Sequence, residues 1–213
     1  MPERYPGYDV LAKRHTPSWN RATRETVDRR LAVPREPRFL AAAEFMILKA
    51  IADRIVPQPL GREPIPVAAL VDHRLFQGDQ DGFRNACLPS EREAWRRGLK
   101  ALDAEAHAAY GIGFVPLAEY SRDDLLRQAQ AGTLDAPAWD GMPCKVFFRD
   151  RLLPDIVRAY YSHPTAWSEI GFGGPASPRG YVRMGWNRRD PWEAVEAQPG
   201  EEHAAIESNR HVG

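Results

Sequence analysis

The sequence has few cysteines. Its 213 residues include two, Cys87 and Cys144. They form neither a CxxC motif nor a pair at zinc-ligand spacing, so the sequence indicates no dithiol redox centre and no cysteine-bound metal. Three states stay open for them: one intramolecular disulfide, two buried thiols, or one bond to a partner chain.

Long hydrophobic runs are also missing. The most apolar stretch, residues 39–56, carries four charged side chains, whereas a membrane-spanning helix needs about 20 mainly apolar residues. The N-terminus has no apolar run of signal-peptide length and no twin-arginine pair before one. We therefore expect no membrane span. We expect the chain to be cytoplasmic as encoded, or periplasmic if it is exported with a partner that carries the signal.

A surplus of charge is absent too, because 29 basic residues balance 29 acidic ones. Proteins that bind nucleic acid through phosphate contacts need a basic surplus or a basic stripe. The sequence therefore predicts no nucleic-acid partner.

Strand patterns are weak, since no stretch alternates cleanly over more than about four residues. Apolar residues recur instead at spacings of three and four, the helical period. We predict an all-α fold, a single irregular helical domain of about five or six helices with extended N- and C-terminal arms. Ser90 and Glu93 match a capping box, Gly111 and Gly132 mark helix ends, and Pro154 predicts a kink or a break. The expected helices cover residues 23–31, 38–56, 67–75, 90–110, 121–131 and 142–160.

Composition divides the chain into three regions. Residues 1–37 are polar and rich in proline, and form an N-terminal arm whose aromatic side chains Tyr5, Tyr8 and Trp19 we expect to dock onto a surface. Residues 38–186 form the helical domain. Residues 187–213 form a polar tail, for which we predict disorder from about residue 198 onward.

The most unusual stretch is residues 159–183, which read AYYSHPTAWSEIGFGGPASPRGYVR. The residue before a proline avoids the helical region, so a helix should end at His163. The glycines that follow let the backbone pass close to another surface. Because prolines and aromatic side chains are mixed in, the stretch is typical of a shaped surface and not of a flexible linker.

The same stretch offers one candidate for catalysis. His163 and Glu169 could act as an acid/base pair or as two metal ligands in a stand-alone enzyme. No second ligand pair lies nearby, and the His163 ring could instead hydrogen-bond the last free carbonyls of its helix. Residues 171–174 lack the strand and the lysine of a phosphate-binding loop, and no nucleophile elbow occurs.

Three motifs resemble the gluconate 2-dehydrogenase subunit 3 family: DRIVP at residues 53–57, LDAEA at 102–106, and above all YxxHPxxWxEIGFxGP at 160–175 with PxGY at 178–181. The resemblance covers about residues 39–183. It implies a noncatalytic small subunit that binds and stabilises a large flavoprotein dehydrogenase of the glucose-methanol-choline type. Relatives support export of that partner, but this chain lacks their twin-arginine signal.

The cofactors implied by the resemblance lie outside this chain. FAD is expected in the large subunit, which oxidises a sugar, a sugar acid or a polyol, and haem c in a cytochrome subunit that often accepts the electrons. Within this chain we predict a partner interface and no catalytic, cofactor or metal site. A structural scaffold unrelated to redox chemistry is the remaining alternative. The predicted interface residues are His163, Trp167, Glu169, Phe172, Gly174, Pro175 and Tyr181.

Overall fold

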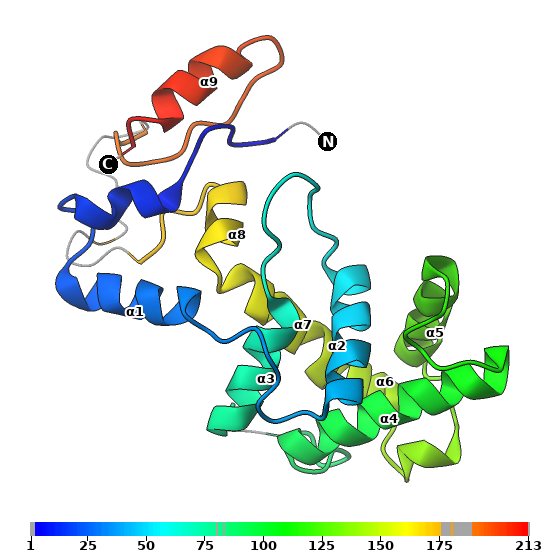
Figure 1. The fold of residues 1–213 in the computed structure, drawn as a ribbon. Coiled ribbons are helices and arrows are strands. Elements are labelled where there is room, and N and C mark those ends of the chain that lie inside the picture. Colours follow the sequence, from blue (N-terminus) through cyan, green and yellow to red (C-terminus); the bar gives the residue numbers. More distant parts are fainter. Residues whose placement is uncertain (1–2, 80, 83, 176–179, 181–188, 213) are drawn as a thin grey trace. The chain divides into compact units, whose positions relative to one another are not determined.

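The structure, a computed structural model, describes residues 3–79, 81–82, 84–175, 180 and 189–212. These residues form helices and loops and contain no strand (Figure 1), which confirms the all-α prediction. The six expected helices correspond to α1–α5 and to α6 with α7. The α-helices are α1 (Arg21–Leu31), α2 (Ala42–Ile55), α3 (Val67–Gln77), α4 (Glu91–Tyr110), α5 (Glu119–Ala131), α6 (Cys144–Phe147), α7 (Leu153–Tyr161), α8 (Pro164–Glu169) and α9 (Glu202–Asn209).

The chain divides into two compact units. Met1–Ala32 and Tyr161–Gly213 form one, here called the terminal unit, and Val33–Tyr160 form the other, here called the bundle unit. This division differs from the predicted boundaries at residues 37 and 187, because the two ends of the chain pack together. The tail also differs from the predicted disorder, since α9 lies within it.

The bundle unit is a set of helices around an apolar core. Leu48 and Ile51 of α2, Leu99 and Leu102 of α4, and Leu125 of α5 are fully buried there. The Trp95 and Phe147 rings meet edge to face with centroids 5.6 Å apart. A Cβ at Gly98 would lie 2.2 Å from the Phe147 ring, so only glycine lets this ring pack against α4.

In the bundle unit, glycines end two helices at the positions predicted from the sequence. Gly111 and Gly132 adopt left-handed conformations with φ of 75° and 89°, and end α4 and α5 as predicted. The predicted capping box at Ser90 is wrong. The Ser90 side chain makes no capping hydrogen bond, and the Glu93 carboxylate accepts from Arg97, one turn along the helix, at 2.6 Å.

The helical pattern is irregular near Pro154, where a kink or a break was predicted. A π-helical segment, η3 (Phe148–Leu152), separates α6 from α7, and Pro154 is the second residue of α7. Proline has no N–H to donate to the preceding turn, and its ring crowds the carbonyl four residues back. Arg151 lies in this π-helical segment and is buried, and it takes part in an ionic cluster.

Candidate functional site

The core of the terminal unit is assembled from three segments that lie far apart in the sequence. Tyr8, Val10 and Trp19 come from the N-terminal arm, Trp167 from α8 and Val212 from the tail, and all are buried in one cluster. Besides Val10, η1 (Val10–His15) contributes a second buried residue, Lys13. The predicted docking of aromatic arm residues is confirmed for Tyr8 and Trp19, and the surface they cover belongs to the chain itself.

His163 begins a helix. It is the N-cap of α8, and its Nδ1 accepts a hydrogen bond from the Thr165 N–H at 3.3 Å. The predicted contact between its ring and the last carbonyls of the preceding helix stays a prediction. Pro164 is the first residue of α8, where its missing N–H leaves no gap in the hydrogen bonding. The ring fixes the start of α8, and α8 carries Trp167 into the core.

Trp167 is the centre of the terminal unit and is only 3% exposed. Its indole Nε1 donates to the Tyr161 carbonyl at 2.7 Å. The Phe172 ring meets it edge to face, with centroids 5.8 Å apart, and the Arg30 guanidinium lies 5.3 Å from its ring centroid. Because Trp167 is enclosed, it holds the surrounding residues in place. Its predicted contribution to a partner interface would therefore be indirect, through the residues that it positions.

Two glycines of the predicted loop mark close contacts with the N-terminal arm. At Gly171, where φ is 67°, an added Cβ would lie 2.6 Å from the Tyr5 ring. At Gly174, where φ is 70°, it would lie 3.2 Å from both Trp19 and Val10. The sequence indicated that these glycines let the backbone approach another surface, and the structure confirms it.

The exposed large apolar side chains of the stretch, here called the apolar rim, are Tyr161, Ile170 and Phe172. Phe172 was predicted as an interface residue, whereas Tyr161 and Ile170 were not, although both belong to the stretch and one to the motif. Glu169 and Pro175 are partly buried, and His163 and Gly174 are buried. Tyr181 lies outside the described residues. A partner interface at these residues stays a prediction.

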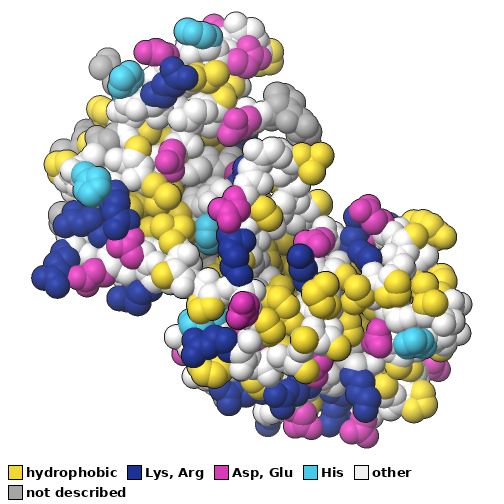
Figure 2. Space-filling view, viewed as in Figure 1, with side chains coloured by type: hydrophobic (Ala, Val, Ile, Leu, Met, Phe, Trp, Pro, Cys, Tyr) yellow, Lys and Arg dark blue, Asp and Glu magenta, His cyan; other side chains and the backbone are white. Residues whose placement is uncertain are grey.

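The two units differ in the type of side chain that their surfaces expose. Figure 2 shows basic side chains gathered over α1 and hydrophobic side chains gathered over α2. The large hydrophobic side chain that α2 exposes is Met46. On α1, Arg21 pairs with Glu25 and Arg14 of η1 pairs with Asp28, so acidic residues balance part of the basic surface.

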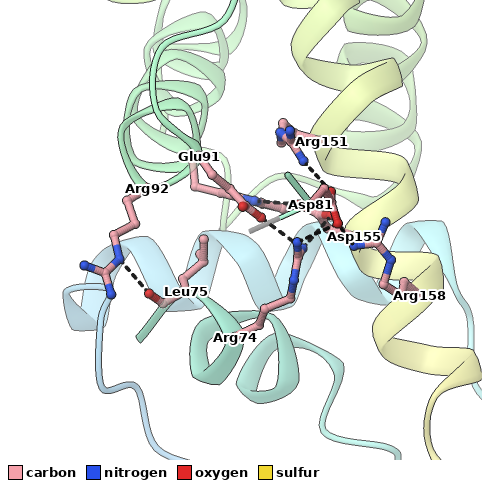
Figure 3. Close-up of polar contacts among 9 residues, drawn as sticks. Arg74, Leu75, Asp81, Glu91, Arg92, Arg151, Asp155 and Arg158 are labelled. Atoms are coloured by element: carbon pink, nitrogen blue, oxygen red, sulfur yellow. Dashed lines mark hydrogen bonds and ion pairs between the residues drawn. The ribbon is translucent and has the colours of Figure 1, made fainter. Parts of the chain in front are cut away.

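The bundle unit contains a partly buried ionic cluster (Figure 3). Arg74 contacts Asp81 at 3.0 Å, Glu91 at 2.9 Å and Asp155 at 3.0 Å. From η3 and α7, Arg151 and Arg158 reach Asp81 at 2.9 and 2.8 Å. The cluster thereby joins α3, α4 and α7 to the loop that follows α3.

Burial and pairing act in opposite directions on these carboxyls. Burial raises the pKa of Asp155, even though the Trp95 indole donates a hydrogen bond to it at 3.0 Å. Burial likewise raises the pKa of Glu91. At Asp81 burial also favours the neutral form, but hydrogen bonds from Arg151 and Arg158 outweigh it and lower the pKa. Because each carboxylate faces arginine, the cluster is suited to holding elements together more than to proton transfer.

Two open clefts lie in the bundle unit. One of about 460 Å³ runs along residues 131–145 and includes Cys144. The other, of about 370 Å³, lies between α2 and residues 64–69, with Lys49 and Asp53 in its lining. Cys144 is buried and its thiol donates to the Leu134 carbonyl at 3.3 Å, while Cys87 is an exposed free thiol. Neither cleft contains a histidine.

Two other kinds of site are absent from the described part of the chain. Within it, no three His, Cys, Asp or Glu side chains come together as a set of metal ligands. No helix in that part has the length and apolar character to cross a membrane.

The comparison with known families decides the classification. The family model for gluconate 2-dehydrogenase subunit 3 matches residues 42–174, more than half of the chain. The chain belongs to this family. No curated protein and no solved structure matches it. The gluconate 2-dehydrogenase subunit 3 match takes in the whole ionic cluster, Trp167 and Gly174. It leaves out the arm residues Tyr8 and Trp19 that cover Trp167.

Proposed function

We propose that the chain is a noncatalytic small subunit that binds and stabilises a large FAD-dependent dehydrogenase of the glucose-methanol-choline type. The observation that carries the proposal is the family match over residues 42–174, because that family is described as one subunit of a dehydrogenase. The partner would hold FAD and oxidise a sugar, a sugar acid or a polyol. A c-type cytochrome with haem c would accept the electrons as a further subunit, and the location of the complex would follow from the partner.

The chemistry of the described residues supports an accessory role. The carboxylates of the ionic cluster are paired with arginines. His163 accepts a backbone N–H at the start of α8. A general base needs a lone pair directed at a substrate, whereas these groups hold helices and loops in place.

The apolar rim supplies a contact surface of the right kind. Protein interfaces are enriched in aromatic side chains and depleted of charged ones at their centre. Phe172 is held by its N–H, which donates to the Trp167 carbonyl at 2.9 Å, and by its ring contact with Trp167. A side chain fixed before binding loses little conformational entropy on association. We therefore place part of the dehydrogenase interface at this rim.

A matched pair of substitutions tests the proposal. Ile170 in the rim is 46% exposed and Ile112 in the bundle unit is 45% exposed. The chain is co-expressed with the flavoprotein dehydrogenase of its source organism, and the affinity of the purified subunits is measured. We expect Ile170→Asp to weaken binding at least about tenfold, since it places a charge in an apolar contact, and Ile112→Asp to leave binding unchanged.

Two results would contradict the proposal. One is the absence of any complex between the wild-type chain and the flavoprotein. The other is bound flavin, together with sugar oxidation, in the purified chain alone. Equal binding by the Ile170→Asp and Ile112→Asp variants would remove the rim from the interface and leave the subunit role standing.

A further inference from the structure

The loop that joins α2 to α3 presents one apolar side chain to solvent. Figure 1 shows this loop extending beyond the ends of both helices. Leu60 lies in it and is 101% exposed, the largest exposed fraction among the large hydrophobic side chains of the described residues. Tyr120 follows at 76%. Leu60 therefore makes almost no contact that stabilises the fold.

The loop is nevertheless tied down at its base. The Gln58 side chain accepts from the Ile65 N–H at 2.6 Å and donates to the Ile65 carbonyl at 2.9 Å. This pair of bonds imitates the pairing of two strands and closes the loop between residues 58 and 65. Pro57, Pro59 and Pro64 further restrict the backbone.

Side chains beyond the tip are held as well. Arg62 donates to the Tyr160 hydroxyl at 3.3 Å, and Glu63 pairs with Arg35 at 2.6 Å. Gly61, next to Leu60, has no atom within 4 Å of the position a Cβ would take. Leu60 therefore protrudes beside an uncrowded glycine, a shape that fits a recessed socket better than a flat surface.

We propose that Leu60 is an anchor that inserts into an apolar socket of the flavoprotein dehydrogenase subunit. This inference rests on the proposed function and adds a contact from the bundle unit to it. A leucine that is held in place before binding adds buried apolar area at little cost in loop entropy. Burying an apolar side chain in a pocket that excludes water stabilises a complex.

The charges beside Leu60 favour a protein socket over a lipid surface. Peripheral membrane segments combine apolar side chains with clustered lysine and arginine, which attract anionic lipids. Here the flanking charges are Arg62 and Glu63, and Arg35 is paired with Glu63. The balanced tip offers no basic cluster, so we assign the socket to the dehydrogenase subunit.

The test measures binding of the purified full chain to the purified dehydrogenase subunit. We expect Leu60→Asp to raise Kd at least about tenfold and Leu60→Met, which keeps an apolar side chain of similar volume, to stay within about threefold. The melting temperature of the isolated chain should not change in either variant, because Leu60 contacts nothing that stabilises the fold.

The remaining outcomes separate a failure of the Leu60 anchor from a failure of the proposed function. If Leu60→Asp binds as the wild type does, the anchor is wrong and the proposed function stands. If the wild-type chain does not bind, both fail. A lower melting temperature of the isolated Leu60→Asp chain would show that Leu60 packs within the chain. A Leu60-dependent dimer in sedimentation, or Leu60-dependent binding to phosphatidylserine vesicles, would assign the side chain to a second copy or to lipid and overturn the proposal.

Discussion

The terminal unit and the bundle unit are stabilised by different kinds of contact. The bundle unit is built from long helices, and its ionic cluster joins α3, α4 and α7 around Arg74. The terminal unit has short helices, and its core joins the N-terminal arm, α8 and the tail around Trp167. One unit depends on helices with local periodicity, whereas the other depends on contacts between the two ends of the chain.

The family match covers the bundle helices but not every segment that forms the core of the terminal unit. The family match covers α2 to Gly174, and so includes the bundle helices and the Trp167 stretch. Tyr8 and Trp19, which bury Trp167, lie before the match begins. The motif stretch is therefore shaped in part by segments outside the matched region. Substitutions in the N-terminal arm should disturb the motif stretch and leave the ionic cluster of the bundle unit unaffected.

The largest expected effect is that of Trp167→Ala. Removing a buried tryptophan costs about 3–5 kcal/mol in the free energy of unfolding, because it leaves a cavity. The loss should appear in urea denaturation, and hydrogen exchange should rise in residues 3–32 and 161–175 with little change in α2–α5. Faster exchange spread evenly over α2–α5 would contradict the separation of the two units.

Asp155→Ala should destabilise the bundle unit. Removing one partner of a buried ionic contact typically costs about 3–5 kcal/mol. We expect the lower end, about 3 kcal/mol, because Arg74 keeps Asp81 and Glu91 as partners. Asp150→Ala is the control, since Asp150 pairs with the exposed Arg149 and should cost less than about 1 kcal/mol. Calorimetry of both variants checks the difference.

Gly174→Ala should have a smaller effect, confined to the terminal unit. Gly174 and Gly200 both have positive φ, at 70° and 84°, but of the two only Gly174 has side chains within 4 Å of the position that a Cβ would take. The left-handed backbone costs alanine about 1–2 kcal/mol at either site. Gly174→Ala should therefore be the less stable of the two variants, and equal melting temperatures would show that the arm does not press on this glycine.

The smallest effect concerns pH and Asp81. Hydrogen bonds from Arg151 and Arg158 hold its pKa below the usual range despite burial. A carboxyl with a lowered folded pKa stabilises the fold above its unfolded pKa of about 3.9, and this contribution is lost as the pH falls toward the folded value. Asp81→Asn should reduce stability at neutral pH and flatten its decline between about pH 5 and pH 3.

The opposite sign applies to Glu91 and Asp155, whose pKa values burial raises. The pH-dependent stabilisation from these two carboxyls is fully present below the pKa of the unfolded state. It is lost as the pH rises through the raised pKa of the folded state. Urea titrations at several pH values compare the wild type with Asp81→Asn. An unchanged pH profile would mean that Asp81 is not the group that responds.

Helix periodicity predicted the bundle unit well, because each of its long helices has an apolar face that repeats every three or four residues. The predicted helix boundaries were less accurate where a residue distant in the sequence hydrogen-bonds the backbone at the start of a helix. The helix expected from residue 38 begins at Ala42, because Asp72 of α3 accepts the N–H groups of Arg38, Phe39 and Leu40. Nothing local to residues 38–41 signals that contact.

The terminal unit was harder to predict for the same reason. Asn209 accepts from the Val195 N–H at 2.7 Å and donates to the Pro6 carbonyl at 2.9 Å, so the polar tail is held by the other end of the chain. Composition alone indicated disorder there. The aromatic residues of the arm and the glycines of the loop were recognised as docking features, but their sequence gives no sign that they dock on each other.

Native mass spectrometry of the chain co-purified with its flavoprotein dehydrogenase tests the central claim most directly. The account predicts a complex that contains both subunits, releases this chain without flavin and leaves FAD on the large subunit. A chain that purifies without the flavoprotein, or that retains the flavin itself when the complex is dissociated, would contradict it.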